Sequence, residues 1–343
     1  MSGALILAGI ILVTLVLYSV LGGADFGAGF WDLMCVGKRW QEQRDLIASA
    51  IHPVWETNHI WLILIIVLLF SGFPPAFSSV SLALAVPIYL ILLGIVLRGS
   101  SYVFRAYFTG NIRTQLYWGT VFSISSSLTP IFLGIVIGAI SGDTVIADNG
   151  ISQNGFLETW FHPFPLIVGF LSLCLFAYLS ACYLTVEAET AALKDDFRNR
   201  ALISGVVSAV AAVVTYILAG DAAQGIRAGL LENPAARLTE LGAAISAVVA
   251  FRALWTRRFY QARIAAAAQV TLILLGWGAS QYPYLIRPDL TISNSASPAP
   301  VISGLVIAIA IGALLLIPSI AALFRVFKAN RKATLTDGFI PPF

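Results

Sequence analysis

Polar and ionisable side chains stand at the start of an apolar segment that runs from Ala50 to Phe77. Residues 51–70 of this segment are long enough to cross a bilayer as a helix, which takes about 20 residues. Its first turns hold His52, Trp55, Glu56, Asn58 and His59. An ionisable group within hydrocarbon is costly unless it faces protein or water, so such a residue is a functional candidate by default. A sheltered carboxylate of this kind can take up and release protons, and other helices must supply its partners.

The composition indicates what those other helices are. The chain has 343 residues, 59% of them hydrophobic and only 11% charged, and its mean hydropathy is +0.88. This leaves too little polar surface to cover a soluble protein of this size. We therefore predict an all-α fold, a polytopic transmembrane helical bundle that forms a single integral membrane domain over residues 1–343.

Apolar runs along the chain predict nine spans. They lie near residues 3–22, 51–70, 79–98, 118–140, 161–186, 199–219, 236–256, 262–281 and 301–327. The first run lacks the basic start and the cleavage site of a signal peptide, so we interpret it as a span. No long polar insertion separates the spans, and no soluble domain is expected.

The basic residues orient this set of spans. Of the 20 Lys and Arg residues, only Arg227, Arg237 and Arg287 fall on the side that also holds the N-terminus. The others lie in the loops after spans one, three, five and seven and in the C-terminal tail. Because cytoplasmic loops carry the excess of Lys and Arg, we expect the N-terminus outside and the C-terminus in the cytoplasm.

This orientation places three charged residues in one leaflet. Asp25 comes at or beyond the cytoplasmic end of span one, Glu56 lies about two turns into the bilayer, and Arg98 ends span three. If they share one bundle interior, they form a network of carboxylates and a guanidinium that is open to cytoplasmic water and can pass protons inward.

Each of these residues also has a plainer interpretation. Asp25 can be an interfacial residue at the end of span one, and Arg98 can be a snorkelling residue on the positive side. Glu56 has the stronger case for a role beyond packing, because it lies inside the apolar run and Pro53 suits a first helical turn.

The histidines argue against a metal or haem ligated by this chain. A haem held by two histidines needs imidazoles at one depth on facing helices, but His52 and His59 are about 10 Å apart along one helix. His162 begins the fifth span from the other side and more readily caps a helix or lies at the outer interface. One axial histidine with a weak second ligand stays open. The spacing of the three cysteines, Cys35, Cys174 and Cys182, suggests neither a disulfide framework nor a zinc site.

Glycines and prolines predict packing and a turn. The spacings Gly23–Gly27 and Gly134–Gly138 favour close approach of helices. The segment 71–75, Ser-Gly-Phe-Pro-Pro, predicts a stiff reversal that sets spans two and three side by side and antiparallel. The sequence contains no P-loop, nucleophile elbow or metalloprotease spacing.

Two motifs together resemble a known family. The first span ends in GGADFGAG at residues 22–29, and the second begins with AIHPVWETNHIWL at residues 50–62, followed by the turn at 70–77. These resemble subunit II of the cytochrome bd quinol oxidases, a group that includes the cyanide-insensitive oxidases. The nine-span plan covers the whole chain in the same way, while the motifs concentrate in its first third.

The resemblance implies a heterodimer in the bacterial cytoplasmic (inner) membrane. Subunit I would carry haem b, haem d and the quinol-oxidising loop, and this chain would ligate none of them. The complex would oxidise quinol and reduce dioxygen to water with protons from the cytoplasm. Some members hold a structural quinone in subunit II, for which this sequence offers no local motif. The resemblance leaves open a small single-span third subunit and implies contact with membrane lipid and no nucleic acid.

The resemblance also implies roles for the candidate residues. Trp55 and Glu56 match an aromatic and acidic pair that lines a proton path, with Asn58 in the same motif. Asp25 matches the acidic residue of helix one, and Arg98 matches the arginine that ends helix three. His59 stands where some members have Gln, which leaves its role open.

Two other classes of protein compete with the oxidase subunit. A stand-alone proton-coupled secondary transporter would use the same buried carboxylates, and composition alone does not exclude it. Nine spans without a visible inverted repeat or paired broken helices argue mildly against a transporter. A purely structural membrane anchor would leave Glu56 unexplained.

Overall fold

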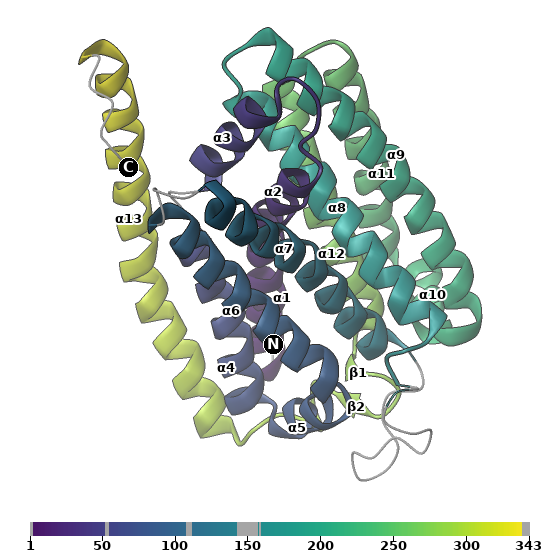
Figure 1. The fold of residues 1–343 in the computed structure, drawn as a ribbon. Helices are drawn as coiled ribbons and strands as arrows, with labels where there is room; N and C mark the ends of the chain where they lie inside the picture. The colour runs from purple at the N-terminus through teal and green to yellow at the C-terminus, as the bar shows by residue number, and fades with distance from the viewer. Residues whose placement is uncertain (1–2, 52–54, 108–111, 143–156, 158, 338–343) are drawn as a thin grey trace.

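The computed structural model describes residues 3–51, 55–107, 112–142, 157 and 159–337, and they form a bundle of long helices (Figure 1). Within those ranges, eight helices are long and apolar enough to cross a membrane, and the count rises to nine if the bent pair α4–α5 is one span. The all-α class is confirmed, and the predicted nine spans match the upper count.

The elements after the third span follow the predicted spans in order, although the helix predicted at 199–219 begins eight residues earlier and the one predicted at 301–327 ends ten residues later. They are α7 (Ile112–Ser141), α8 (Pro163–Glu187), α9 (Ala191–Ala222), α10 (Gln224–Glu232), α11 (Pro234–Trp255), α12 (Phe259–Gln281), a small antiparallel hairpin of β1 (Tyr284–Ile286) and β2 (Leu290–Thr291), and α13 (Ala299–Asp337). The short helix α10 and the hairpin lie in segments expected to be loops.

The first span is longer than the predicted 3–22. α1 (Gly3–Leu17), the π-helical turn η1 (Tyr18–Gly22) and α2 (Gly23–Leu33) follow one another without a break and give one candidate span of 31 residues. The two glycines at the η1–α2 junction do not end the helix, because both keep right-handed helical torsion angles. Asp25 therefore lies inside the span, and the prediction that it comes at or beyond the end is wrong.

The second predicted span is described only in part. The described helices are α3 (Trp40–Ile51), which ends where the described residues end, and α4 (Trp55–Gly72) after the gap. Residues 52–54, with His52 and Pro53, lie outside the described residues. For residues 55–57 only the helical backbone is described, so the side chains of Trp55 and Glu56 lie outside the described part as well.

The reversal after α4 contains a helix of its own. α5 (Pro74–Ala83) leaves α4 at an angle of 118°. Its first two residues are prolines, which the first turn of a helix tolerates because those N–H groups have no intrahelical partner. The third span is consequently α6 (Ala85–Tyr107) rather than 79–98, and α6 packs chiefly along α7. Arg98 lies nine residues before the end of α6 and does not end it as predicted.

The centre of the bundle is formed where α7 and α2 pack on α8. A Cβ atom on Gly134 would lie 2.6 Å from the carbonyl oxygen of Val168, and one on Gly27 would meet the carbonyl oxygen of Phe176. Only glycine permits such close contact between helix backbones. The packing role predicted for both glycine patterns is confirmed.

The two ends of the bundle differ in charge. Helix α3, the end of α2, and the α8–α9 and α11–α12 turns lie at one end, and α5, α10 and the hairpin lie at the other (Figure 1). Ion pairs join the first set, with Arg39 2.6 Å from Asp196 and Arg257 3.2 Å from Asp195. We call this end the basic end. Its cations include Lys38, Arg39, Arg44, Lys194, Arg198, Arg200, Arg252, Arg257, Arg258 and Arg263.

Candidate functional site

Asp25 is buried in the bundle interior, with 7% of its surface exposed. The side-chain amide of Asn58 on α4 donates a hydrogen bond to the Asp25 carboxylate on α2. Asp25 precedes the end of α2 by eight residues, which at 1.5 Å per residue is about 12 Å. A carboxylate at this depth is therefore held by protein groups rather than by lipid or bulk water.

Arg98 lies next to this pair and is almost completely buried, with 2% exposed. Its Nε donates a 3.1 Å hydrogen bond to Oγ of Ser126 on α7, and its Nη1 lies 3.4 Å from Nε2 of His59. The guanidinium lies over the rings of Phe26 and Phe122, at 4.8 and 5.4 Å from their centroids. Such cation–π contacts are strongest where water is excluded.

Asp25 and Arg98 interact electrostatically without forming a direct ion pair. Together they bring one negative and one positive charge into the same buried interior. We call the set Asp25, Asn58, His59, Arg98 and Ser126 the central cluster. Buried charges persist only where opposite charges and hydrogen bonds compensate them, and the central cluster provides both.

A helical irregularity borders the central cluster. The π-helical turn η1 ends three residues before Asp25, and π-turns inside α-helices occur frequently at functional sites. The ring of Tyr18 in η1 packs near His59 and Phe26, with centroids 6.3 and 6.4 Å away. Three buried atoms here, Tyr18 Oη, His59 Nδ1 and Arg98 Nη2, have no hydrogen-bond partner among the described residues. Buried polar atoms of this kind call for ordered water or a further side chain.

A second group of charges surrounds Asp32, which is fully buried. Ser123 on α7 donates a 2.6 Å hydrogen bond to one carboxylate oxygen of Asp32. The other oxygen lies 3.4 Å from Nη1 of Arg105 on α6 and 3.5 Å from Nε of Arg44 on α3. We call Asp32, Arg44, Arg105 and Ser123 the end cluster, because it lies toward the basic end.

The two clusters line up along the same three helices. Asp25 and Asp32 on α2, like Arg98 and Arg105 on α6, are seven residues apart and so share one helix face. Ser123 and Ser126 on α7 are one turn apart, about 4.5 Å along the axis. Gly29 lies between Asp25 and Asp32 on α2, and a Cβ atom on it would collide with the side chain of Ser126. The helices α2 and α7 are therefore in contact here. The clusters thus form one polar seam that leads from the basic end to Asp25.

The structure brings together four of the six predicted site residues: Asp25, Asn58, His59 and Arg98. Trp55 and Glu56 belong to the first turn of α4, and their side chains lie outside the described residues. The end cluster and Ser126 were missed. Two signals were available for them, namely the seven-residue spacing of the two aspartates and the serine-rich stretch 123–127 inside an apolar span.

The described histidines are poorly placed to bind metal. His59 has the Arg98 guanidinium beside its Nε2, and a fixed cation disfavours a metal ion at that nitrogen. His162 is the N-terminal cap residue of α8, as predicted, but its exposed side chain makes no capping hydrogen bond. Among the residues that the structure describes, no group of three or more His, Cys, Asp or Glu side chains could hold a metal ion.

The long apolar helices and the polar seam define a polytopic membrane protein. Its interior holds buried charged side chains whose charges are compensated by neighbouring groups. Comparison with known proteins narrows this class. The chain belongs to the family of cytochrome bd terminal oxidase subunit II, whose model matches residues 3–327. It is therefore a membrane-spanning subunit of a respiratory quinol oxidase, and this membership favours the oxidase interpretation over a stand-alone transporter.

Individual relatives are similar at modest identity. The candidate cytochrome bd menaquinol oxidase subunit II of Bacillus subtilis is 26% identical over 344 residues, covering 96% of this chain and 97% of that protein. Subunit 2 of the cytochrome bd-I ubiquinol oxidase of Escherichia coli K12 is 24% identical over 61% of this chain and 54% of that protein. A chain in the structure of bd oxidase from Geobacillus thermodenitrificans shares the fold, with a TM-score of 0.76 and 24% identity over 95% of this chain and 99% of that chain.

Proposed function

We propose that this chain is the haem-poor subunit II of a cytochrome bd-type oxidase that oxidises quinol and reduces dioxygen to water with protons from the cytoplasm. A partner subunit I holds haem b and haem d, and this chain supplies structure and part of the proton path. The family match supports the oxidase assignment. The polar seam is the observation that carries the proton role.

The seam offers groups of two kinds. Carboxylates and serine hydroxyls can both accept and donate protons, whereas guanidinium groups remain charged and only donate hydrogen bonds. In the proposed path, protons enter at Asp32, pass the hydroxyls of Ser123 and Ser126, and reach Asp25. Arg98 and Arg105 compensate the negative charge of the two carboxylates. The unpartnered atoms of Tyr18 and His59 mark where ordered water completes the path.

Glu56 is the proposed continuation of this path. Its position in α4 is three residues before His59, and positions i and i+3 share a helix face. The backbone of residue 56 is therefore one helical turn from that of His59, toward the start of α4. We propose that Glu56, with Trp55 beside it in the sequence motif, exchanges protons with Asp25 and hands them to the haem-bearing subunit.

The direction of the path follows from the charge of the two ends. Positive residues accumulate on the cytoplasmic side of membrane proteins. We therefore assign the basic end to the cytoplasm, with the C-terminus on that side and the N-terminus outside. The end cluster then opens toward the compartment that supplies the protons.

The partner subunit requires a broad apolar surface, and α4, α6 and α13 offer one. α13 is the least buried of the candidate spans, and it packs on this chain mainly through α1 and α4. Its apolar residues are largely exposed, as are Phe70 of α4 and Leu92 of α6, at 61% and 57%. We propose that subunit I packs against this surface and so lies next to α4, which carries Glu56.

The test is oxygen consumption by the purified two-subunit complex with Glu56→Gln or Asp25→Asn. Each change keeps the shape of the side chain and removes a group that can carry a proton. We expect turnover to fall by tenfold or more while the haem absorption spectrum keeps its intensity. The matched control is Asp289→Asn, at an exposed position in the hairpin at the opposite end, which should leave turnover unchanged.

Two results would contradict the proposal in different ways. Turnover that is unchanged in both variants would remove the proton role and leave the oxidase assignment intact. A tagged chain that purifies without any haem-bearing partner, as a colourless protein that binds a small solute, would contradict the oxidase assignment itself.

A further inference from the structure

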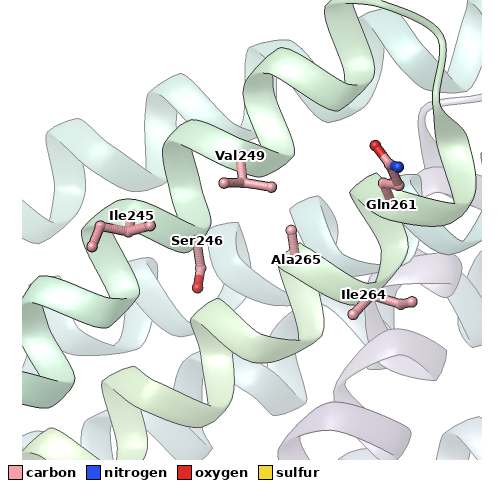
Figure 2. Close-up of a pocket in the computed structure, with 6 residues that line it drawn as sticks. All are labelled: Ile245, Ser246, Val249, Gln261, Ile264 and Ala265. Atoms are coloured by element: carbon pink, nitrogen blue, oxygen red, sulfur yellow. The ribbon is translucent and has the colours of Figure 1, made fainter.

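A groove lies between α11 and α12, away from the polar seam. Its volume is about 470 Å³, and it is lined by Ile245, Ser246, Val249, Gln261, Ile264 and Ala265. Figure 2 shows Val249 and Ala265 pointing into the space between the two helices, with Gln261 near the turn that joins them. Ile245 and Ile264 are 55% and 56% exposed, so the groove opens on the surface of two membrane spans.

Four arginines of α11, α12 and the turn between them lie at the basic end of this groove, and Arg198 of α9 donates hydrogen bonds to the backbone of the last residues of α11. Two of them are neutralised, since Arg257 lies 3.2 Å from Asp195 and Arg263 lies 3.2 Å from Glu187. The other two, Arg252 and Arg258, are exposed and have no acidic partner in the part of the chain that the structure describes.

Both unpaired arginines belong to the groove by their helical positions. Arg252 follows Ile245 by seven residues and so continues the groove face of α11. Arg258 is the N-terminal cap residue of α12, three residues before Gln261. The first N–H groups of α12 have no intrahelical partner and add partial positive charge at the same place.

Aromatic residues indicate the depth of this end of the groove. Trp255 and Tyr260 flank the turn and are 65% and 68% exposed. Tryptophan and tyrosine concentrate at the level of the lipid headgroups. The groove therefore starts at headgroup depth, where the unpaired cations lie, and continues into the acyl region, where its lining is apolar except for Ser246.

We infer that this groove binds an anionic phospholipid, with the phosphate held by Arg252 and Arg258 and one acyl chain packed along Val249 and Ile264. Charge complementarity selects this occupant, because two unpaired cations face the layer in which lipid phosphates lie. A free phosphate ion would leave the apolar part of the groove unused. A zwitterionic lipid carries a positive group that the two arginines repel.

The experiment measures lipid binding to the purified, delipidated oxidase complex by native mass spectrometry. Phosphatidylglycerol and phosphatidylcholine are titrated separately. We expect Arg252→Gln and Arg258→Gln each to weaken binding of phosphatidylglycerol about fivefold, the effect of one basic residue near a membrane surface. The affinity for phosphatidylcholine should not change. Lys38→Gln, which removes an exposed cation at the same end but outside the groove, is the matched control.

A second pair of variants tests the acyl part of the site. Val249→Trp fills the groove and should weaken binding of both lipids, whereas Val248→Trp places the same side chain on the neighbouring surface, where Val248 is 68% exposed. A thermal melt checks that each variant keeps the stability of the parent. Equal losses in Lys38→Gln and the two arginine variants, equal binding of both lipids by the parent, or unchanged binding in Val249→Trp would each overturn the inference. None of these outcomes depends on the proton path.

Discussion

Replacing Asp25 and Arg98 singly and together tests whether the two charges of the central cluster stabilise one another. In Arg98→Gln the guanidinium loses its contacts with Ser126, His59 and two aromatic rings, and the Asp25 carboxylate loses its compensating charge. In Asp25→Asn the buried guanidinium loses its counter-charge. Removing one member of a buried, compensated pair typically costs about 3–5 kcal/mol.

The coupling between the two sites can be bounded from the structure. Among the ion pairs of the described residues none joins Asp25 to Arg98, so their charged atoms are more than 4.0 Å apart. At that separation the Coulomb energy is about 4 kcal/mol for an effective dielectric constant of about 20, and this is an upper limit. We expect the double variant to be about 1–3 kcal/mol more stable than the sum of the two single losses predicts, the range found for interacting sites.

The assay is reversible unfolding of the purified chain in mixed micelles with increasing denaturing detergent, followed by near-ultraviolet circular dichroism. The four proteins of the double-mutant cycle are compared under identical conditions. A matched second cycle combines Asp25→Asn with Lys38→Gln, because Lys38 is an exposed cation outside the seam. That cycle should be additive.

The reasoning would fail if the Asp25 and Arg98 losses add within about 0.5 kcal/mol, as they do for distant, independent sites. The two charges would then be buried independently, and the central cluster would not act as one unit.

Two further predictions concern packing and reactivity. Gly134→Ala should destabilise the isolated chain by about 1–3 kcal/mol, because the added Cβ lies 2.6 Å from the Val168 carbonyl oxygen and the backbone must shift. Gly9→Ala has no atom within 4 Å of the added Cβ and should be neutral or stabilising by up to about 1 kcal/mol in the same detergent titration. Burial raises the pKa of the Cys35 thiol, so its thiolate forms only at higher pH than in the unfolded chain. Maleimide should therefore label Cys35 more slowly in the folded chain than in the chain unfolded by detergent. The ratio of the two rates should be largest below the ordinary thiol pKa and fall as the pH rises toward the pKa of the folded-state thiol, and equal rates at every pH would contradict this.

The helical class and the membrane location could be predicted because they depend on composition and run length, which are local properties. The end of the first span could not. A Gly-Gly pair followed by an aspartate suggests an interface, and the interior placement of Asp25 depends on Asn58 and Arg98, which are 33 and 73 residues further along the chain. The groups that compensate a buried charge come from other helices, so they cannot be predicted from the local sequence around that charge.

Arg98 and Asp32 are two further residues whose surroundings could not be predicted from the local sequence. Arg98 was placed at a helix end because the apolar run before it is long enough to span a membrane, whereas α6 starts later and continues for nine residues beyond it. Asp32 is not predictable as a site residue from the local sequence, because its partners come from α3, α6 and α7. The relative positions of Asp25 and Asp32 on one helix face were predictable from their spacing, but the facing serines and arginines were not.

The π-turn η1 has a consequence for which neighbours each half of the first span faces. A π-turn holds one residue more than an α-helical turn, and one residue corresponds to about 100° of rotation. The half before the turn, α1, packs on α4, α12 and α13, while the half after it, α2, packs on α7 and α8. The extra residue offsets the facing side of α2 from that of α1 by about 100° relative to an uninterrupted α-helix, so each half meets its own set of neighbours. Deleting one residue from Tyr18–Gly22 would remove this offset and turn either Leu7 or Asp25 out of its present surroundings.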